Sequence, residues 1–153
     1  MRRIAPLRAI RRQALKGESL GLSGERIAAR ALRRAGLRQL GTRLKTREAE
    51  LDILMLDRET LVAVEVKTGR SRLDPTDFGS RPTWRPGHRF GAEDLTRVRR
   101  ATARIAERQD RPYRVDLVEL VLFERTTRIY HHIDIEHPLP HPAGGAFGTV
   151  LEP

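Results

Sequence analysis

The sequence predicts one domain with a mixed α/β layer structure. Two segments show the three-to-four-residue apolar spacing of helices, and several others show the alternating or continuous apolar pattern of strands. The chain has 153 residues, of which 39% are hydrophobic and 33% charged, so it is long enough to bury one core. It contains no cysteine, which leaves carboxylates and histidines as the main candidate metal ligands.

The N-terminal half is predicted to contain a helix and three strands. Residues 1–17 form a basic arm, and Ser23 is the expected N-cap of a helix that ends at Gly36. Residues 37–45 are a weak strand candidate. Residues 50–56 and 61–67 are stronger candidates because they are almost entirely apolar and are joined by the polar turn 57–60.

The C-terminal half is predicted to contain one helix and two strands. Residues 69–91 are rich in Gly, Pro, Ser and Arg and lack periodicity, so we expect a long loop that is functional or disordered. A helix is expected over residues 92–108, with strands over 115–123 and 128–135. The Pro- and Gly-rich residues 138–153 predict a flexible tail, which leaves 18–137 as the domain. The predicted order is therefore α-β-β-β-α-β-β.

Two acids are predicted to face each other in the hairpin of the two stronger strands. If the turn is centred between Arg58 and Glu59, paired positions sum to 117, and Asp52 lies opposite Glu65. Opposed side chains have Cβ atoms ~5 Å apart, so the two carboxylates repel each other unless a cation lies between them. Mg²⁺ or Mn²⁺ is the expected cation, because hard divalent ions are held by one or two carboxylates plus water and phosphate oxygens.

Lys67 and Glu25 are further candidate site residues. Lys67 follows Glu65 by two residues and so shares its strand face. It is one of three lysines among 30 basic residues, the others being arginines. A lysine in such a chain suggests that this position requires a compact ammonium group and not a planar guanidinium. Either acid of the hairpin alone would be interpreted as a solvated surface charge, whereas the combination with Lys67 favours a site. Glu25 leans toward the buried side of the first helix, where a site role and a helix-stabilising role are equally favoured.

These residues resemble a known nuclease motif. The spacing of Asp52 and Glu65-Val66-Lys67 is similar to the D…(D/E)-x-K pattern of the restriction-endonuclease-like superfamily. Residues 21–25, 50–54, 64–68, 114–118 and 131–133 together resemble the YraN-type family of predicted endonucleases, over roughly residues 20–135.

The resemblance implies a restriction-endonuclease-like αβββαβ core with a mixed sheet flanked by helices. It also implies that Glu25, Asp52, Glu65 and Lys67 are the site residues. Arg43 and Ala49 depart from the family pattern, because asparagine and glycine are usual at these two positions.

The net charge of +10 points to a polyanionic partner, with nucleic acid favoured over a membrane surface. Of the nucleic acids, DNA is expected more than RNA. We therefore expect a metal-dependent nuclease. Contacts with the sugar–phosphate backbone are expected from Arg97, Arg99 and Arg100. Stacking on unpaired bases is expected from Trp84 and Arg85 of the loop, and Lys45 is a further candidate for binding nucleic acid. Packing of Trp84 and Phe90 against the body of the domain is an equally favoured alternative to stacking.

Other interpretations stay open at this point. The chain could be a non-catalytic nucleic-acid-binding protein that retains the nuclease fold, or a basic protein-interaction module. His131 and His132 point to opposite faces of one strand, so surface roles are expected rather than joint metal ligation. No stretch approaches the ~18 apolar residues of a membrane span, and the start lacks the apolar run of a secretory signal. A cytoplasmic monomer or homodimer is expected, with an arginine-rich organellar transit segment as a less favoured alternative.

Overall fold

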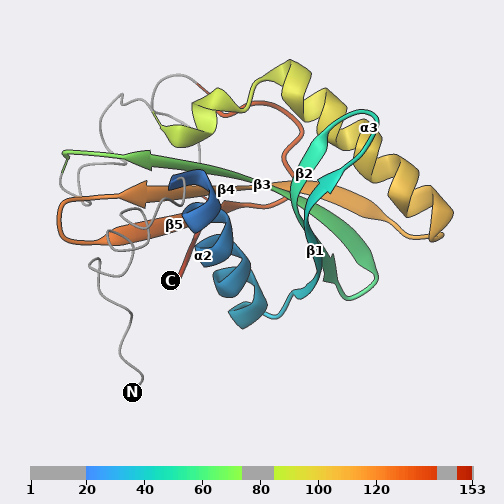
Figure 1. Cartoon of the computed structure of the whole chain (residues 1–153), viewed down its shortest axis with the longest axis horizontal. Coiled ribbons are helices and arrows are strands. Elements are labelled where there is room, and N and C mark those ends of the chain that lie inside the picture. Colours follow the sequence, from blue (N-terminus) through green and yellow to red (C-terminus); the bar gives the residue numbers. More distant parts are fainter. Residues whose placement is uncertain (1–19, 74–84, 141–147, 153) are drawn as a thin grey trace.

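A six-stranded mixed sheet forms the centre of the computed structural model, which describes residues 20–73, 85–140 and 148–152 (Figure 1). The strands lie in the order β1-β2-β3-β4-β5-β6; β3 and β4 are parallel, and the other neighbouring pairs are antiparallel. The elements are α2 (Leu20–Arg34), β1 (Arg38–Lys45), β2 (Glu50–Asp57), β3 (Thr60–Arg70), η1 (Pro86–Arg89), α3 (Ala92–Arg108), β4 (Tyr113–Leu122), β5 (Thr127–His132) and β6 (Thr149–Leu151). This order confirms the predicted mixed α/β class and is consistent with a restriction-endonuclease-like αβββαβ core.

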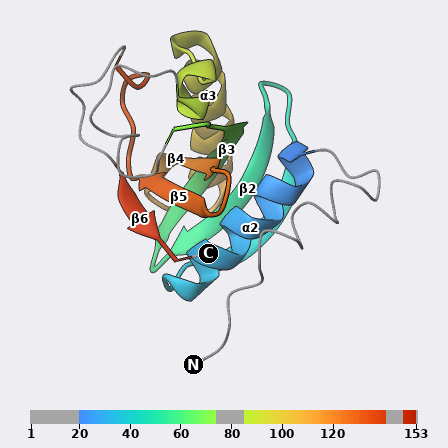
Figure 2. The ribbon, with the colours of Figure 1, turned by 90° about the vertical axis from the view of Figure 1, so that its left-hand side faces the viewer.

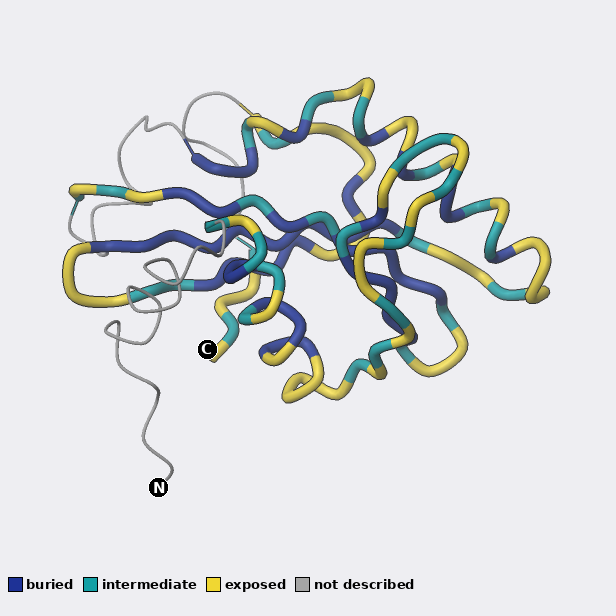
Figure 3. Tube along the Cα trace, in the orientation of Figure 1, coloured by how far each residue is buried: buried dark blue, intermediate teal, exposed yellow. Residues whose placement is uncertain are grey.

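Helices α2 and α3 pack against opposite faces of the sheet (Figure 2). Val62, Val64 and Val66 of β3 belong to the cluster buried under α2. Leu61 and Ala63 belong to the cluster buried under α3. Successive residues of a strand point to opposite faces, so β3 supplies both cores and is apolar along most of its length. The central strands are accordingly buried over long stretches in Figure 3.

The β2–β3 hairpin has the predicted register. Ile53 pairs with Val64, and Asp57 pairs with Thr60, so that each pair sums to 117. Arg58 adopts a φ of 55°, the left-handed conformation that tight hairpin turns commonly need. The register therefore places Asp52 level with Glu65, one position beyond the last paired residues.

The connection from β3 to β4 crosses the sheet on the α3 face. Parallel neighbours need such a crossover, and here it contains η1 and α3, the latter with the predicted bounds 92–108. The parallel register brings Lys67 of β3 beside Glu119 of β4. Arg89 Nη2 donates a hydrogen bond to the Thr68 carbonyl at 2.5 Å, so the crossover is attached to the end of β3 directly after Lys67.

Three predicted boundaries were wrong. α2 already includes Leu20, so Ser23 is a buried residue inside the helix and not its N-cap. β3 continues to Arg70 in register with β4, and η1 occupies residues 86–89, so the predicted loop 69–91 is ordered at both ends. β5 ends at His132 instead of residue 135, because Asp134 adopts a φ of 53° and turns the chain away from the ladder.

The segment predicted to be a flexible tail contains a strand. Thr149–Leu151 form β6, which pairs antiparallel with β5. A Cβ atom at Gly148 would lie 2.4 Å from the His131 carbonyl oxygen, so only glycine allows the chain to approach β5 this closely. A three-residue strand is too short to leave a periodic signal in the sequence, which explains why it was missed.

The predicted basic arm, residues 1–17, lies outside the described residues, as do residues 74–84 of the predicted loop. In the part of the chain that the structure describes, no helix combines the length and apolar character needed to cross a bilayer.

Candidate active site

Asp52 lies where β2 and β3 separate. The last ladder pair at this end of the hairpin joins Ile53 to Val64. One residue further, Asp52 Oδ2 accepts a hydrogen bond from the Val66 backbone N–H at 2.8 Å. A side-chain carboxylate thus takes the place that a backbone carbonyl would have in a continued ladder. This bond fixes one oxygen of Asp52 against β3, directly beside Glu65.

Glu65 and Lys67 share the α3 face of β3, as predicted. Lys67 Nζ lies 2.7 Å from Glu65 Oε1, and the two side chains are 23% and 12% exposed. The same ammonium lies 5.8 Å from the centroid of the Phe90 ring, a cation–π distance. Phe90 is 1% exposed and belongs to the core under α3, which confirms the packing alternative for this residue. The Lys67 ammonium therefore lies between a carboxylate and an aromatic ring.

Glu25 joins these residues from α2. It lies in the second turn of the helix, so the predicted alternative of a stabilising acid in the first turn is wrong. Its carboxylate is close enough to Asp52 for the charge of Asp52 to raise its pKa. Arg43 lies between two acids, with Nη1 3.8 Å from Glu25 Oε1 and Nη2 3.2 Å from Glu50 Oε1. Four acids and two cations thus surround the end of the hairpin.

Arg43 of β1 has a backbone conformation that few non-glycine residues adopt. Arg43 adopts a φ of 49° in β1, a left-handed conformation that asparagine tolerates better than most residues. The asparagine that the resemblance implies at this position would suit this backbone. Arginine in its place retains the same conformation and adds a positive charge between Glu25 and Glu50.

Burial and mutual repulsion raise the pKa of three acids at this site. Burial, followed by the charge of Asp52, raises the pKa of Glu65 to about 7, although Lys67 acts in the opposite direction. Burial also raises the pKa of Asp52, although the hydrogen bond from the Val66 N–H and the charge of Lys67 lower it. Burial, then Asp52, raises the pKa of Glu25. The site therefore has less positive charge than its carboxylates need, a deficit that an added cation would reduce.

The donor set fits a hard divalent ion that keeps most of its water. Asp52 and Glu65 offer two carboxylates, and Mg²⁺ is commonly held in proteins by one or two. Across the described residues, no group of three or more histidines, aspartates or glutamates has the geometry to hold a metal ion. The side chains present thus suit an open ion shared with solvent and substrate oxygens, and not a closed cage of protein ligands.

The basic residues predicted to contact nucleic acid are spread over several elements. Lys45 is exposed at the end of β1. Arg97 forms ion pairs with acids of its own helix, and Arg99 donates a hydrogen bond to the Ile135 carbonyl. Arg100 is exposed on α3. Contacts of these residues with nucleic acid stay a prediction.

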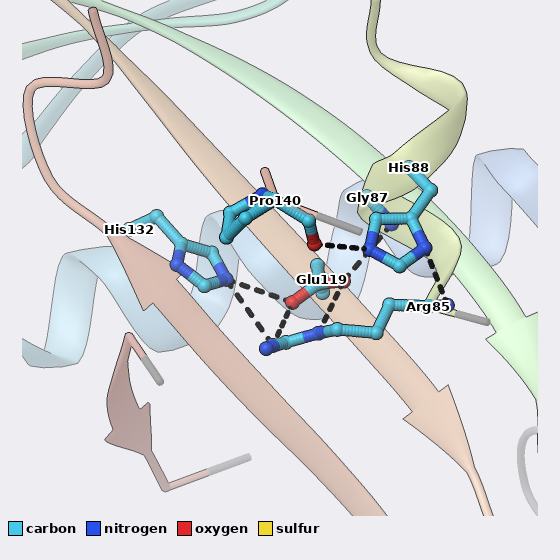
Figure 4. Close-up of polar contacts among 6 residues, drawn as sticks. All are labelled: Arg85, Gly87, His88, Glu119, His132 and Pro140. Carbon is cyan, nitrogen blue, oxygen red and sulfur yellow. Dashed lines mark hydrogen bonds and ion pairs between the residues drawn. The ribbon is translucent and has the colours of Figure 1, made fainter. Parts of the chain in front are cut away.

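Arg85 belongs to a buried ion-pair network (Figure 4). Its Nε donates to Glu119 Oε1 at 3.1 Å, and its Nη2 forms an ion pair with Oε2. Gly87 N–H donates to Oε1 at 2.9 Å, and His132 Nε2 lies 2.7 Å from Oε2. This placement argues against the predicted stacking of Arg85 on unpaired bases, while Trp84 lies outside the described residues.

The histidines do not have the predicted surface roles. His131 and His132 are 4% and 7% exposed, and they point to opposite faces of β5, as expected. His131 Nε2 lies 2.8 Å from Asp116 Oδ2, and His132 contacts Glu119. Asp116 and Glu119 were not among the predicted site residues. Their signal is present in the sequence, because an acid inside an otherwise apolar strand must have a partner when that strand is buried.

Comparison with known proteins places the chain in a family. Residues 24–120, more than half of the chain, match the model of Uncharacterised protein family UPF0102. A UPF0102 protein of Beutenbergia cavernae is 37% identical over 107 residues, which cover 68% of this chain and 83% of the relative. UPF0102 proteins of Nocardia farcinica and Alkaliphilus oremlandii are 30% and 31% identical over 119 and 120 residues, covering 76% and 74% of this chain and 87% and 94% of the relatives. The matched range includes Glu25, Asp52, Glu65 and Lys67, and the chain belongs to the UPF0102, or YraN-type, family.

Proposed function

We propose that the chain is a metal-dependent nuclease that hydrolyses phosphodiester bonds of nucleic acid, with DNA favoured over RNA. The main support is the juxtaposition of two partly buried acids of raised pKa, Asp52 and Glu65, with Lys67 Nζ 2.7 Å from Glu65. This arrangement costs the metal-free fold free energy and would be relieved by a divalent cation. The net charge of +10 supports a polyanionic substrate.

Each side chain has a distinct role in this proposal. Asp52 and Glu65 would hold Mg²⁺ or Mn²⁺, which when bound polarises a phosphate and lowers the pKa of a coordinated water. The Val66 N–H orients Asp52 by fixing one carboxylate oxygen and leaving the other for a ligand. Lys67 supplies a positive charge next to the reacting phosphate, where it offsets negative charge that develops in the transition state or orients the attacking water. Glu25 adds an acceptor for water on the α2 side.

The test is cleavage of linear, flapped and four-way DNA, and of the corresponding RNA, in Mg²⁺, Mn²⁺ or EDTA. Asp52→Asn and Glu65→Gln are expected to lower metal-dependent cleavage by about 100-fold or more, the usual effect of removing one preorganised polar group. Lys67→Ala is expected to lower kcat more than it weakens metal binding. Glu59→Gln is the matched control, because Glu59 is an exposed acid in the turn of the same hairpin and its variant should cleave normally.

Full activity of the Asp52→Asn variant would refute the assignment of the site. Metal-independent binding of nucleic acid by a wild-type protein that cleaves none of these substrates would instead support the non-catalytic alternative. Absence of both binding and cleavage would favour a protein-interaction module.

A further inference from the structure

The outer side of α2 carries arginines as its exposed charged residues. Arg26, Arg30, Arg33 and Arg34 are all exposed. Glu25 is the one acid in the sequence of this helix. Its side chain is only 15% exposed and belongs to the candidate active site, so it is not part of this outer side. We call Arg26, Arg30, Arg33 and Arg34 the arginine face of α2.

The spacing of these residues makes the arginine face continuous. Residues three and four apart lie on the same side of a helix, so Arg26, Arg30 and Arg33 follow one another, with Arg34 next to them. With a rise of 1.5 Å per residue, Arg26 and Arg34 are about 12 Å apart along the helix axis. The face begins directly after Glu25, so it extends outward from the candidate site. Arg43, 49% exposed, adds a positive charge at the same end.

The exposed side of α3 differs in its charge pattern. There Arg97 is paired with Glu93 and Asp94 of the same helix, and Arg104 is paired with Glu48. α3 carries three acids (Glu93, Asp94 and Glu107) beside its five arginines, whereas the arginine face of α2 contains no acid. A single-sign face next to a site concentrates a ligand of opposite charge.

We propose that the arginine face of α2 binds the sugar–phosphate backbone of a nucleic-acid duplex beside the phosphodiester held at Asp52 and Glu65. This inference rests on the proposed function, because it names the surface that holds the substrate. Planar guanidinium groups suit phosphate oxygens, and such contacts supply affinity without reading the sequence. The helix contains no aromatic residue, so it offers no platform for stacking unpaired bases. A duplex, whose bases are already stacked, therefore fits this face better than a single strand.

The experiment measures duplex binding as a function of salt in EDTA, with Asp52→Asn as the background so that cleavage plays no part. The double variant Arg26→Gln/Arg30→Gln is compared with Arg104→Gln/Arg108→Gln. Both pairs are exposed, lie four residues apart on a helix and remove the same net charge. Each lost phosphate contact changes the slope of log affinity against log salt by about 0.9, so the α2 variant should lose about 1.8 of the slope. The α3 variant should keep the slope of the background protein.

The remaining outcomes also decide the proposal. A larger loss of affinity for duplex than for single-stranded DNA in the α2 variant is expected; an equal loss for both would overturn the assignment to a duplex. An unchanged slope in the α2 variant, or the same loss in both variants, would show that α2 is not the contact surface. These results do not depend on turnover. If the wild-type protein bound duplex through α2 but cleaved no substrate, the proposed nuclease function would be wrong, while the assignment of the arginine face as a duplex-binding surface would be supported.

Discussion

Two pairs of acids lie on the same sheet, Asp52 and Glu65 partly buried and Asp116 and Glu119 fully buried, and their surroundings act on them in opposite ways. Burial raises the pKa of Asp52 and Glu65, and for Glu65 it reaches about 7. Burial acts in the same direction on Asp116 and Glu119 of β4, but hydrogen bonds and positive charges hold the pKa of both below its usual value. The difference between the pairs is therefore the supply of donors and not the loss of water.

The donors of Asp116 show how the fold compensates a buried acid. Its carboxylate accepts hydrogen bonds from Arg114 Nε at 2.9 Å and from the Asp134 N–H at 2.9 Å, and it lies 2.8 Å from His131 Nε2. Glu65, by comparison, has the Lys67 ammonium as its one hydrogen-bonding partner among the described residues. A fold that neutralises two acids fully and leaves two others short of positive charge indicates different uses for the two pairs. Asp116 and Glu119 connect neighbouring strands and the crossover, whereas Asp52 and Glu65 are suited to receive a cation.

The largest expected effect comes from breaking the network of Glu119. The Glu119 side chain is 0% exposed, and Arg85→Met removes the guanidinium that pairs with its carboxylate. Removal of one partner from a buried ion pair lowers the free energy of unfolding by about 3–5 kcal/mol. Urea unfolding at pH 7 in EDTA measures this loss.

Arg97→Met is the matched control for that measurement. Arg97 pairs with Asp94 on the surface of α3, with both side chains about half exposed, and exposed pairs contribute about 0–1 kcal/mol. A loss below 1 kcal/mol in both variants would mean that the Arg85–Glu119 pair is not structural and that the contrast between the two acid pairs fails.

A smaller effect is expected from the titration of Glu65. Its pKa is about 7 in the folded protein and 4.5 in an unfolded reference. Between these values the folded protein keeps a proton that the unfolded chain has released, so stability falls as pH rises from 4.5 to 7, by at most about 1.4 kcal/mol per pH unit. Glu65→Gln should remove this slope and be as stable as the wild type, or more stable, above pH 7. Urea unfolding of both proteins across this range, in EDTA, measures the difference.

The β4 acids predict the opposite slope in a different pH range. The pKa of Glu119 is lowered from 4.5, so its ionised form stabilises the fold above that pH and this contribution is lost as the pH falls further. Glu119→Gln should therefore change the pH dependence below 4.5, while Glu65→Gln changes it above 4.5. If both variants altered the same range, the two acid pairs would not differ in the way that their donors indicate.

Much of the candidate site could be predicted from the sequence because it depends on local rules. The period of two along a strand sets which residues of β3 share a face, and the polar turn around Arg58 sets the hairpin register. Together they place Asp52 level with Glu65 and place Lys67 on the same face. The helical spacing of apolar residues likewise gave the bounds of α3 without error.

The buried polar networks could not be predicted because their members are distant in the sequence. Glu119 is bonded by Arg85, Gly87 and His132, which come from the crossover and from β5. Arg85 lies in a stretch without periodicity, where an exposed loop residue and a buried ion-pair partner have the same appearance. Strand β6 is three residues long, and its position depends on the close approach of Gly148 to β5.

The smallest expected effect concerns the hydroxyl of Ser23, two residues before Glu25. Ser23 Oγ is buried without a hydrogen-bond partner among the described residues, whereas Thr102 Oγ1, also buried in a helix, donates to the Val98 carbonyl at 2.6 Å. Ser23→Ala should therefore leave the free energy of unfolding unchanged or raise it by up to about 1 kcal/mol, because it removes an unsatisfied group and alanine favours the helix. Thr102→Val, which removes a hydroxyl that is hydrogen-bonded, should lower the free energy of unfolding by about 0.5–1.5 kcal/mol.

Urea unfolding measures both variants. If Ser23→Ala lost as much stability as Thr102→Val, the hydroxyl would have a structural partner; if it kept its stability but lost cleavage, Ser23 would join Asp52 and Glu65 in the site.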